Sequence, residues 1–143
     1  MKMVFADTLY WVAIVRPNDP WGDPAKKAKS SLGNVLLLTT DEVLTEFLTA
    51  LSAGGENLRR QAAKMVRAIL ANPNVKVLPQ SRDSFLRGVD LYEQRPDKEY
   101  SLTDCISMNA MRSESVSEIL TNDRHFNQDG FNVLITQRQD DLT

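Results

Sequence analysis

Short apolar runs alternate with longer amphipathic stretches along almost the whole chain of 143 residues. The run Val35-Leu36-Leu37-Leu38 has no polar side chain, which is typical of a strand that is covered on both faces. Strands that alternate with helices favour a parallel sheet with right-handed crossovers and helices on both sides. We therefore expect an α/β fold, a three-layer α/β/α sandwich around a central, mostly parallel twisted sheet of about five strands.

Apolar periodicity and turn residues place the elements along the chain. Two capping-box patterns, Thr39-x-x-Glu42 and Ser101-x-x-Asp104, predict that helices begin at Thr39 and Ser101. The segment RPNDPWG (16–22) and the stretch through Asp129-Gly130 are expected to be loops. The expected strands are 4–6, 35–38, 75–78, 117–121 and 131–134, and the expected helices are 8–15, 23–32, 39–51, 56–70, 81–92 and 101–111.

Composition favours one globular domain that spans residues 1–143, since hydrophobic residues make up 42% and charged residues 25%. No apolar stretch approaches ~20 residues, and no export signal opens the chain, so we expect a cytoplasmic protein with no membrane segment. The single cysteine, Cys105, allows no internal disulfide and suits a reducing compartment. The net charge of −2 means that any attraction to nucleic acid must be local.

Four carboxylates fall where this fold would bring them together. Asp7 and Asp123 end apolar runs, and Glu46 and Asp104 lie in the first turns of predicted helices that leave the same sheet edge. Clustered acids repel one another unless a cation neutralises them, and oxygen ligands favour Mg²⁺, with Mn²⁺ as a substitute. With one histidine and one cysteine, the chain lacks the usual zinc ligands. The pattern predicts a metal-dependent phosphoryl-transfer enzyme.

Each acid also has a purely structural interpretation. Asp7 could cap the helix that begins at Thr8, Asp104 could serve only its capping box, and Asp123 could be a turn residue. Glu46 is harder to explain in this way, because its neighbours Val43, Leu44, Phe47 and Leu48 are expected to form core.

Other residues have both a functional and a structural interpretation. Thr8, Ser101, Thr121 and Asn122 could orient the carboxylates or could only cap helices and turns, and His125 could be a base or a surface residue. Trp21 could stack on a base or be buried under its loop. The basic residues could track phosphates, dock an acidic partner segment or form solvated helix faces; they are Lys26, Lys27, Lys29, Arg59, Arg60, Lys64 and Arg67.

The segments FADTLYWVA, TTDEVLTEFLTAL, YSLTDCISMNAMR and ILTNDRHFNQDGF resemble the successive signatures of PIN-domain ribonucleases. Within that class they are most similar to VapC-like toxins of prokaryotic type II toxin–antitoxin systems. The resemblance covers almost the entire chain and implies a PIN-like fold with Mg²⁺- or Mn²⁺-dependent endoribonuclease activity. It also implies an acidic quartet at Asp7, Glu46, Asp104 and Asp123, with Thr8 or Thr121 in support. The implied partners are RNA, a cognate antitoxin and a second copy of the chain.

We expect hydrolysis of RNA phosphodiester bonds by a metal-activated water, which leaves 5′-phosphate and 3′-hydroxyl ends. The alternative from another class is a non-catalytic PIN-like module that binds RNA or protein. A phosphate-receiving signalling domain is disfavoured because Asp7 stands alone and no lysine follows Lys98. A structure-specific DNA nuclease usually needs extra segments that 143 residues scarcely accommodate. The RNA target, the antitoxin and the number of metal ions stay open.

Overall fold

The computed structural model describes residues 1–136, in which five strands and seven helices are found. Along the chain the elements are β1 (Lys2–Ala6), α1 (Thr8–Val15), α2 (Gly22–Ser31), β2 (Val35–Thr40), α3 (Asp41–Leu51), α4 (Glu56–Ala71), β3 (Val75–Leu78), α5 (Arg82–Gln94), α6 (Leu102–Ser113), β4 (Glu118–Leu120), α7 (His125–Gln128) and β5 (Asn132–Val133). The single-domain expectation for 1–143 stays a prediction, and residues 137–143 lie outside the described residues.

The five strands form one sheet in the order β3-β2-β1-β4-β5, and every neighbouring pair is parallel. In the register, Val4 of β1 lies opposite Leu37 of β2, and Ala6 of β1 lies opposite Leu120 of β4. The expected α/β fold with a parallel sheet of about five strands is confirmed.

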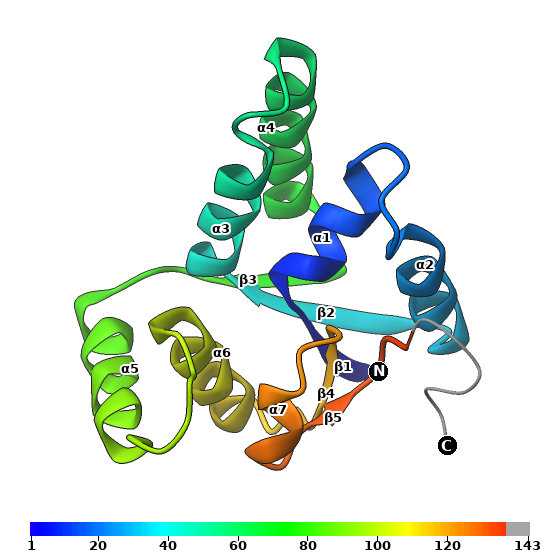
Figure 1. Cartoon of the computed structure of the whole chain (residues 1–143). Coiled ribbons are helices and arrows are strands. Elements are labelled where there is room, and N and C mark those ends of the chain that lie inside the picture. The colour runs from blue at the N-terminus through cyan, green and yellow to red at the C-terminus, as the bar shows by residue number, and fades with distance from the viewer. Residues whose placement is uncertain (137–143) are drawn as a thin grey trace.

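The strand order explains why helices cover both faces of the sheet. From β1 the chain moves outward through β2 to β3, and it then crosses back to β4 and β5 on the other side of β1. Because right-handed crossovers in opposite directions lie on opposite faces, α1–α4 cover one face and α5–α7 cover the other. Figure 1 shows these two groups of helices on either side of the sheet. The expected three-layer sandwich is therefore confirmed.

The core lies along the central strand β1 and the helices that sandwich it. Val4, Phe5 and Ala6 are fully buried, because β1 has a neighbour on each edge and helices over both faces. Phe47 of α3 and Met108 of α6 are also fully buried. Within residues 1–136, no helix is long and apolar enough to cross a membrane.

The predicted start of the third helix at Thr39 was wrong by two residues. Strand β2 continues through Thr40, and the Thr39 hydroxyl donates a hydrogen bond of 3.0 Å to the Ala6 carbonyl on β1. The cap is Thr40, whose hydroxyl accepts from the Val43 backbone N–H at 3.1 Å. Because the Thr39 side chain bonds to β1, Thr40 is the residue that caps α3.

The loop expected through Asp129-Gly130 contains the short helix α7, which the sequence analysis missed. This helix is too short to show an apolar period. It begins after Asp123, whose side chain accepts a hydrogen bond from the His125 backbone N–H at 2.9 Å, and ends before Gly130, which has φ +94°. The helix holds His125 and the fully buried Phe126 in fixed positions.

Candidate metal centre

Four separate segments carry the four acids to one edge of the sheet. Asp7 directly follows β1, Asp123 follows the neighbouring strand β4, Glu46 lies in α3 and Asp104 lies in the first turn of α6. Because the chain leaves β1 and β4 in opposite directions, this edge is the topological switch point, where ligands bind in open parallel sheets. The charges of the acids act on one another in pairs, Asp7 with Asp104 and Glu46, and Asp104 with Asp123 and Glu46, whereas within residues 1–136 only Asp104 and Asp123 of the four offer ligand atoms close to a third residue, His125.

The Asp7 side chain does not cap α1, although Asp7 occupies the N-cap position. Its Oδ2 accepts a hydrogen bond of 2.9 Å from the Thr121 hydroxyl, and the residue is only 8% exposed. Burial raises the pKa of Asp7 to about 7, although hydrogen bonds from Thr8 and Thr121 oppose the shift, and the charges of Asp104 and Glu46 add to it. The helix-cap interpretation therefore does not explain where this carboxylate points.

Glu46 faces the same region from α3. Its Oε1 accepts a hydrogen bond of 2.7 Å from the Thr8 hydroxyl on α1. Its helix neighbours Val43 and Phe47 are fully buried, as expected, whereas Leu48 is 38% exposed. The bond to Thr8 fixes the carboxylate across the gap between two helices that pack on the same face of the sheet.

Asp104 forms the expected capping box with Ser101. Its Oδ2 accepts from the Ser101 backbone N–H at 3.1 Å, and the Ser101 hydroxyl accepts from the Asp104 backbone N–H at 3.0 Å. Burial raises the pKa of Asp104, and the charges of Asp123 and Glu46 raise it further. A carboxylate has about four acceptor positions, so the cap leaves capacity for another ligand.

His125 lies beside Asp123 and Asp104. Its Nδ1 is 3.3 Å from Asp123 Oδ1 and 3.8 Å from Asp104 Oδ2. This nitrogen is buried and has no hydrogen-bond partner among residues 1–136. One ligand atom from each of the three residues lies within 4.8 Å of the others. The donor set, mainly hard carboxylate oxygens with one orphaned imidazole nitrogen, fits a divalent cation such as Mg²⁺ or Mn²⁺.

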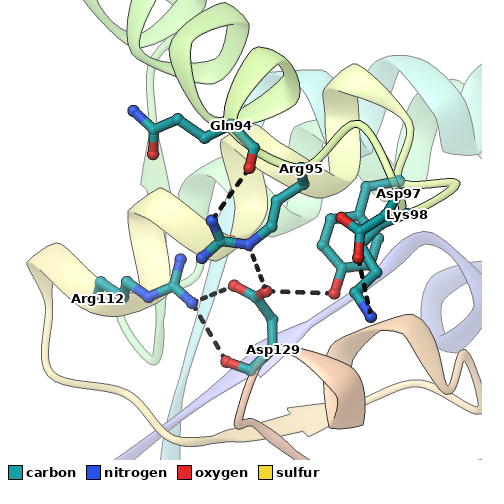
Figure 2. Close-up of polar contacts among 7 residues, drawn as sticks. Gln94, Arg95, Asp97, Lys98, Arg112 and Asp129 are labelled. Atoms are coloured by element: carbon teal, nitrogen blue, oxygen red, sulfur yellow. Dashed lines mark hydrogen bonds and ion pairs between the residues drawn. The ribbon is translucent and has the colours of Figure 1, made fainter.

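A second polar cluster supports this side of the site and was missed from the sequence. Figure 2 shows Asp129, which ends α7, between Arg95 and Arg112. Arg95 Nε donates to its carboxylate at 3.1 Å, the Tyr100 hydroxyl donates at 3.2 Å, and Arg112 pairs with the same group. The Tyr100 ring lies edge-on to His125, with 5.5 Å between ring centroids. Asp129 thus joins the α5–α6 loop, α6 and α7 behind the acid cluster.

Two other candidate groups have ordinary structural contacts. The first turns of α4 carry Arg59, which donates to the Ser52 carbonyl at 2.9 Å, and Arg60, which pairs with Glu56. Figure 1 shows α4 beyond α3, away from α6 and α7. Trp21 packs against the hydrophobic core, which supports its interpretation as a residue buried under its loop. The phosphate-tracking role of the basic residues stays a prediction.

Comparisons with known proteins agree with the observed fold. No protein-family model matches the chain. The 23S rRNA-specific endonuclease VapC20 of Mycobacterium tuberculosis, from the CDC 1551 / Oshkosh and H37Rv strains, is 27% identical over 129 residues, which make up 90% of this chain and 95% of that protein. The crystal structure of M. tuberculosis VapC20, described as a Sarcin-Ricin loop cleaving toxin, superposes with a TM-score of 0.81 at 25% identity and covers 93% of this chain and 99% of that one. In sequence and in fold the chain is thus similar to the VapC20 endonuclease over nearly its whole length, which supports a VapC-like ribonuclease.

Proposed function

We propose that Asp7, Glu46, Asp104 and Asp123 form the catalytic centre and hold Mg²⁺, which Mn²⁺ can replace. One observation carries this proposal. The four carboxylates meet at the switch point of the sheet, and within residues 1–136 none of them forms an ion pair with a lysine or arginine. A cluster of uncompensated acids is costly unless a cation occupies it.

The chemistry follows from this donor set. When bound, the metal would neutralise the acids and the phosphoryl oxygens and lower the pKa of a coordinated water. Three of the carboxylates accept a hydrogen bond that fixes one oxygen: Asp7 from Thr121, Glu46 from Thr8 and Asp104 from the Ser101 backbone N–H. Each of these three keeps further acceptor capacity for a ligand. Attack of water on phosphorus, in line with the 3′ oxygen, breaks the P–O3′ bond and leaves 5′-phosphate and 3′-hydroxyl ends.

The substrate we propose is 23S ribosomal RNA, and the biological role is that of the toxin of a toxin–antitoxin pair. The support is the similarity to a 23S rRNA-specific endonuclease, which extends over 90% of this chain. Such a toxin acts in the cytoplasm, where ribosomes are found, and is held inactive by a cognate antitoxin protein.

The test is to incubate the purified protein with bacterial ribosomes in Mg²⁺ or EDTA and to map new ends by primer extension. The proposal predicts one dominant cut in 23S rRNA, with a 5′-phosphate at the new end and no cut in EDTA. If another RNA is cut while 23S rRNA stays intact, the proposed substrate is wrong, but the proposed nuclease activity stands.

We further propose that two copies of the chain associate through an apolar stripe on α5. Leu86, Val89 and Tyr92 recur every third residue and are 51%, 39% and 56% exposed, which is unusual for such side chains in a monomer. Sedimentation analysis should show a dimer that Val89→Asp converts to a monomer. The matched control is Lys64→Asp on α4, which should leave the mass unchanged. A monomeric parent protein would refute this interface.

A further inference from the structure

A cleft of about 540 Å³ lies beside the acid cluster on the same edge of the sheet. Its wall comes from the first turns of three helices, namely α3, α5 and α6. Thr103 in this wall directly precedes Asp104, and Glu42 lies one helical turn before Glu46. A polymer bound at the acid cluster therefore has this cleft within reach of its next unit.

The cleft combines an exposed aromatic ring with an apolar floor. Phe85 is 41% exposed, and the guanidinium carbon of Arg82 lies 5.5 Å from the centre of its ring. Leu102 and Ile106 of α6 also line the cleft. The helices pack closely here because Gly88 has no side chain: a Cβ at that position would lie 2.6 Å from Ile106 Cγ1.

The charged side chains in the wall bear on whether a base or a phosphate of a nucleic acid fits this cleft. The wall carries the Arg82 guanidinium over the Phe85 ring and the Glu42 carboxylate, and the carboxylate can accept a hydrogen bond from an amino group. Exposed aromatic rings beside arginine are typical platforms for base stacking. Cytosine, adenine and guanine carry an exocyclic amino group, and uracil does not.

We propose that this cleft binds one nucleobase of the RNA next to the cleaved phosphate. The base stacks on Phe85, and Glu42 accepts a hydrogen bond from its exocyclic amino group. The site therefore selects an amino-bearing base at this position. This inference rests on the proposed ribonuclease function, because RNA must reach the acid cluster for the neighbouring base to enter the cleft.

The test measures binding without cleavage, so that it can be separated from the nuclease activity. The full-length Asp104→Asn protein in Mg²⁺ is titrated into short fluorescent oligo(A), oligo(C) and oligo(U), and binding is followed by anisotropy. We expect tighter binding of oligo(A) and oligo(C) than of oligo(U). Phe85→Ala should weaken binding roughly tenfold, Phe85→Trp should restore it, and Glu42→Gln should remove the preference against uracil.

Two controls separate this site from the other proposals. Leu70→Ala, at an exposed leucine on α4 outside both the cleft and the apolar stripe of α5, should bind RNA as the parent does. Sedimentation of each variant shows whether Phe85→Ala acts through association of two copies instead. Unchanged affinity in Phe85→Ala, or a loss that follows only dissociation of a dimer, overturns the base site. Base-selective, Phe85-dependent binding by a parent protein that cuts no RNA would support the site and refute the proposed nuclease.

Discussion

The hydroxyl of Thr121 donates a hydrogen bond of 2.9 Å to Asp7 Oδ2 and joins residues that are 114 positions apart in the chain. Thr121 is fully buried, directly after β4, and its oxygen also accepts from the Asp123 backbone N–H at 3.2 Å. One side chain thus ties together the two acids that follow the adjacent strands β1 and β4. The bond to Asp7 also favours the charged form of a carboxyl that burial would otherwise keep protonated.

Thr121→Val keeps the shape of this side chain but removes the donor. The pKa of Asp7, already raised to about 7, should rise further, because the bond that lowers it is lost. We expect the acidic limb of the pH–rate profile for RNA cleavage to move to higher pH, together with a loss of roughly 1–3 kcal/mol in the free energy of unfolding. Thr121→Ser retains a donor and should restore both. A profile identical to that of the parent would show that this bond does not set the ionisation of Asp7.

Metal binding should stabilise the protein more at neutral pH than in acid. The folded pKa of Asp7 is about 7 against an ordinary value of 3.8, so the folded state holds a proton that the unfolded state releases between these values. In the absence of metal, this group makes stability fall as pH rises from about 4 to about 7, by an amount on the order of 4 kcal/mol at most. A divalent cation competes with that proton and is bound more tightly once the proton is lost.

We therefore expect the melting temperature to rise more with Mg²⁺, relative to EDTA, near pH 8 than near pH 5. Differential scanning calorimetry measures this, with Asp7→Asn as the control that removes the titrating group. Equal stabilisation at both pH values would contradict the placement of Asp7 in a metal site.

His125→Ala should weaken Mn²⁺ binding by roughly tenfold, the loss typical when a group next to metal ligands is removed. The reason is that its Nδ1 lies 3.3 Å from Asp123 Oδ1 and is buried without a hydrogen-bond partner in the described part of the chain. Isothermal titration calorimetry measures the affinity directly. The neighbouring substitution Arg124→Ala is the control, and an unchanged Mn²⁺ affinity in His125→Ala would remove the histidine from the site.

Asp129→Asn should reduce the free energy of unfolding by roughly 1–3 kcal/mol at neutral pH, because it weakens a buried acceptor shared by Arg95, Arg112 and Tyr100. Burial alone would raise the pKa of Asp129, but hydrogen bonds from Arg112 and Arg95 outweigh it, and the pKa lies below 3.8. A lowered pKa stabilises the fold above the ordinary value, and this contribution is lost as pH falls through the folded pKa.

The difference between Asp129→Asn and the parent should therefore shrink in acid when urea unfolding is followed as a function of pH. Asp97→Asn is the control, since the Asp97 side chain is 74% exposed and its contact with Lys98 is long, at 3.8 Å. A deficit that persists unchanged in acid would mean that Asp129 acts through packing and not through its charge.

Much of this fold follows from local pattern. The fully apolar strands predicted a parallel sheet, and Asp7 and Asp123 could be placed at one edge because each follows such a strand. Glu46 stood out because an acid among core residues needs a partner, and its partner is Thr8. Ser101 and Asp104 form the capping box that their spacing predicted.

Other features depend on contacts that no local pattern records. Asp129 lies 34 positions from Arg95 and 29 from Tyr100, and these residues meet only because the α5–α6 loop packs on α7. Thr39 and Thr40 are both suitable helix caps, and the choice between them is made by the bond from Thr39 to Ala6 in the neighbouring strand. His125 reaches the acid cluster because α7 turns it back toward Asp104.

If the four acids hold the metal that cuts RNA, cleavage must depend on the metal and on Asp104, and a comparison of the parent protein with Asp104→Asn tests this directly. Asp23→Asn is the matched control, an aspartate in the first turn of α2 outside the cluster. Circular dichroism checks that each variant is folded, because Asp104 also closes the capping box of α6 with Ser101. We predict cleavage in Mg²⁺ by the parent and by Asp23→Asn, and none in EDTA or by folded Asp104→Asn. Cleavage by Asp104→Asn at the parent's rate, or cleavage that continues in EDTA, would contradict the account.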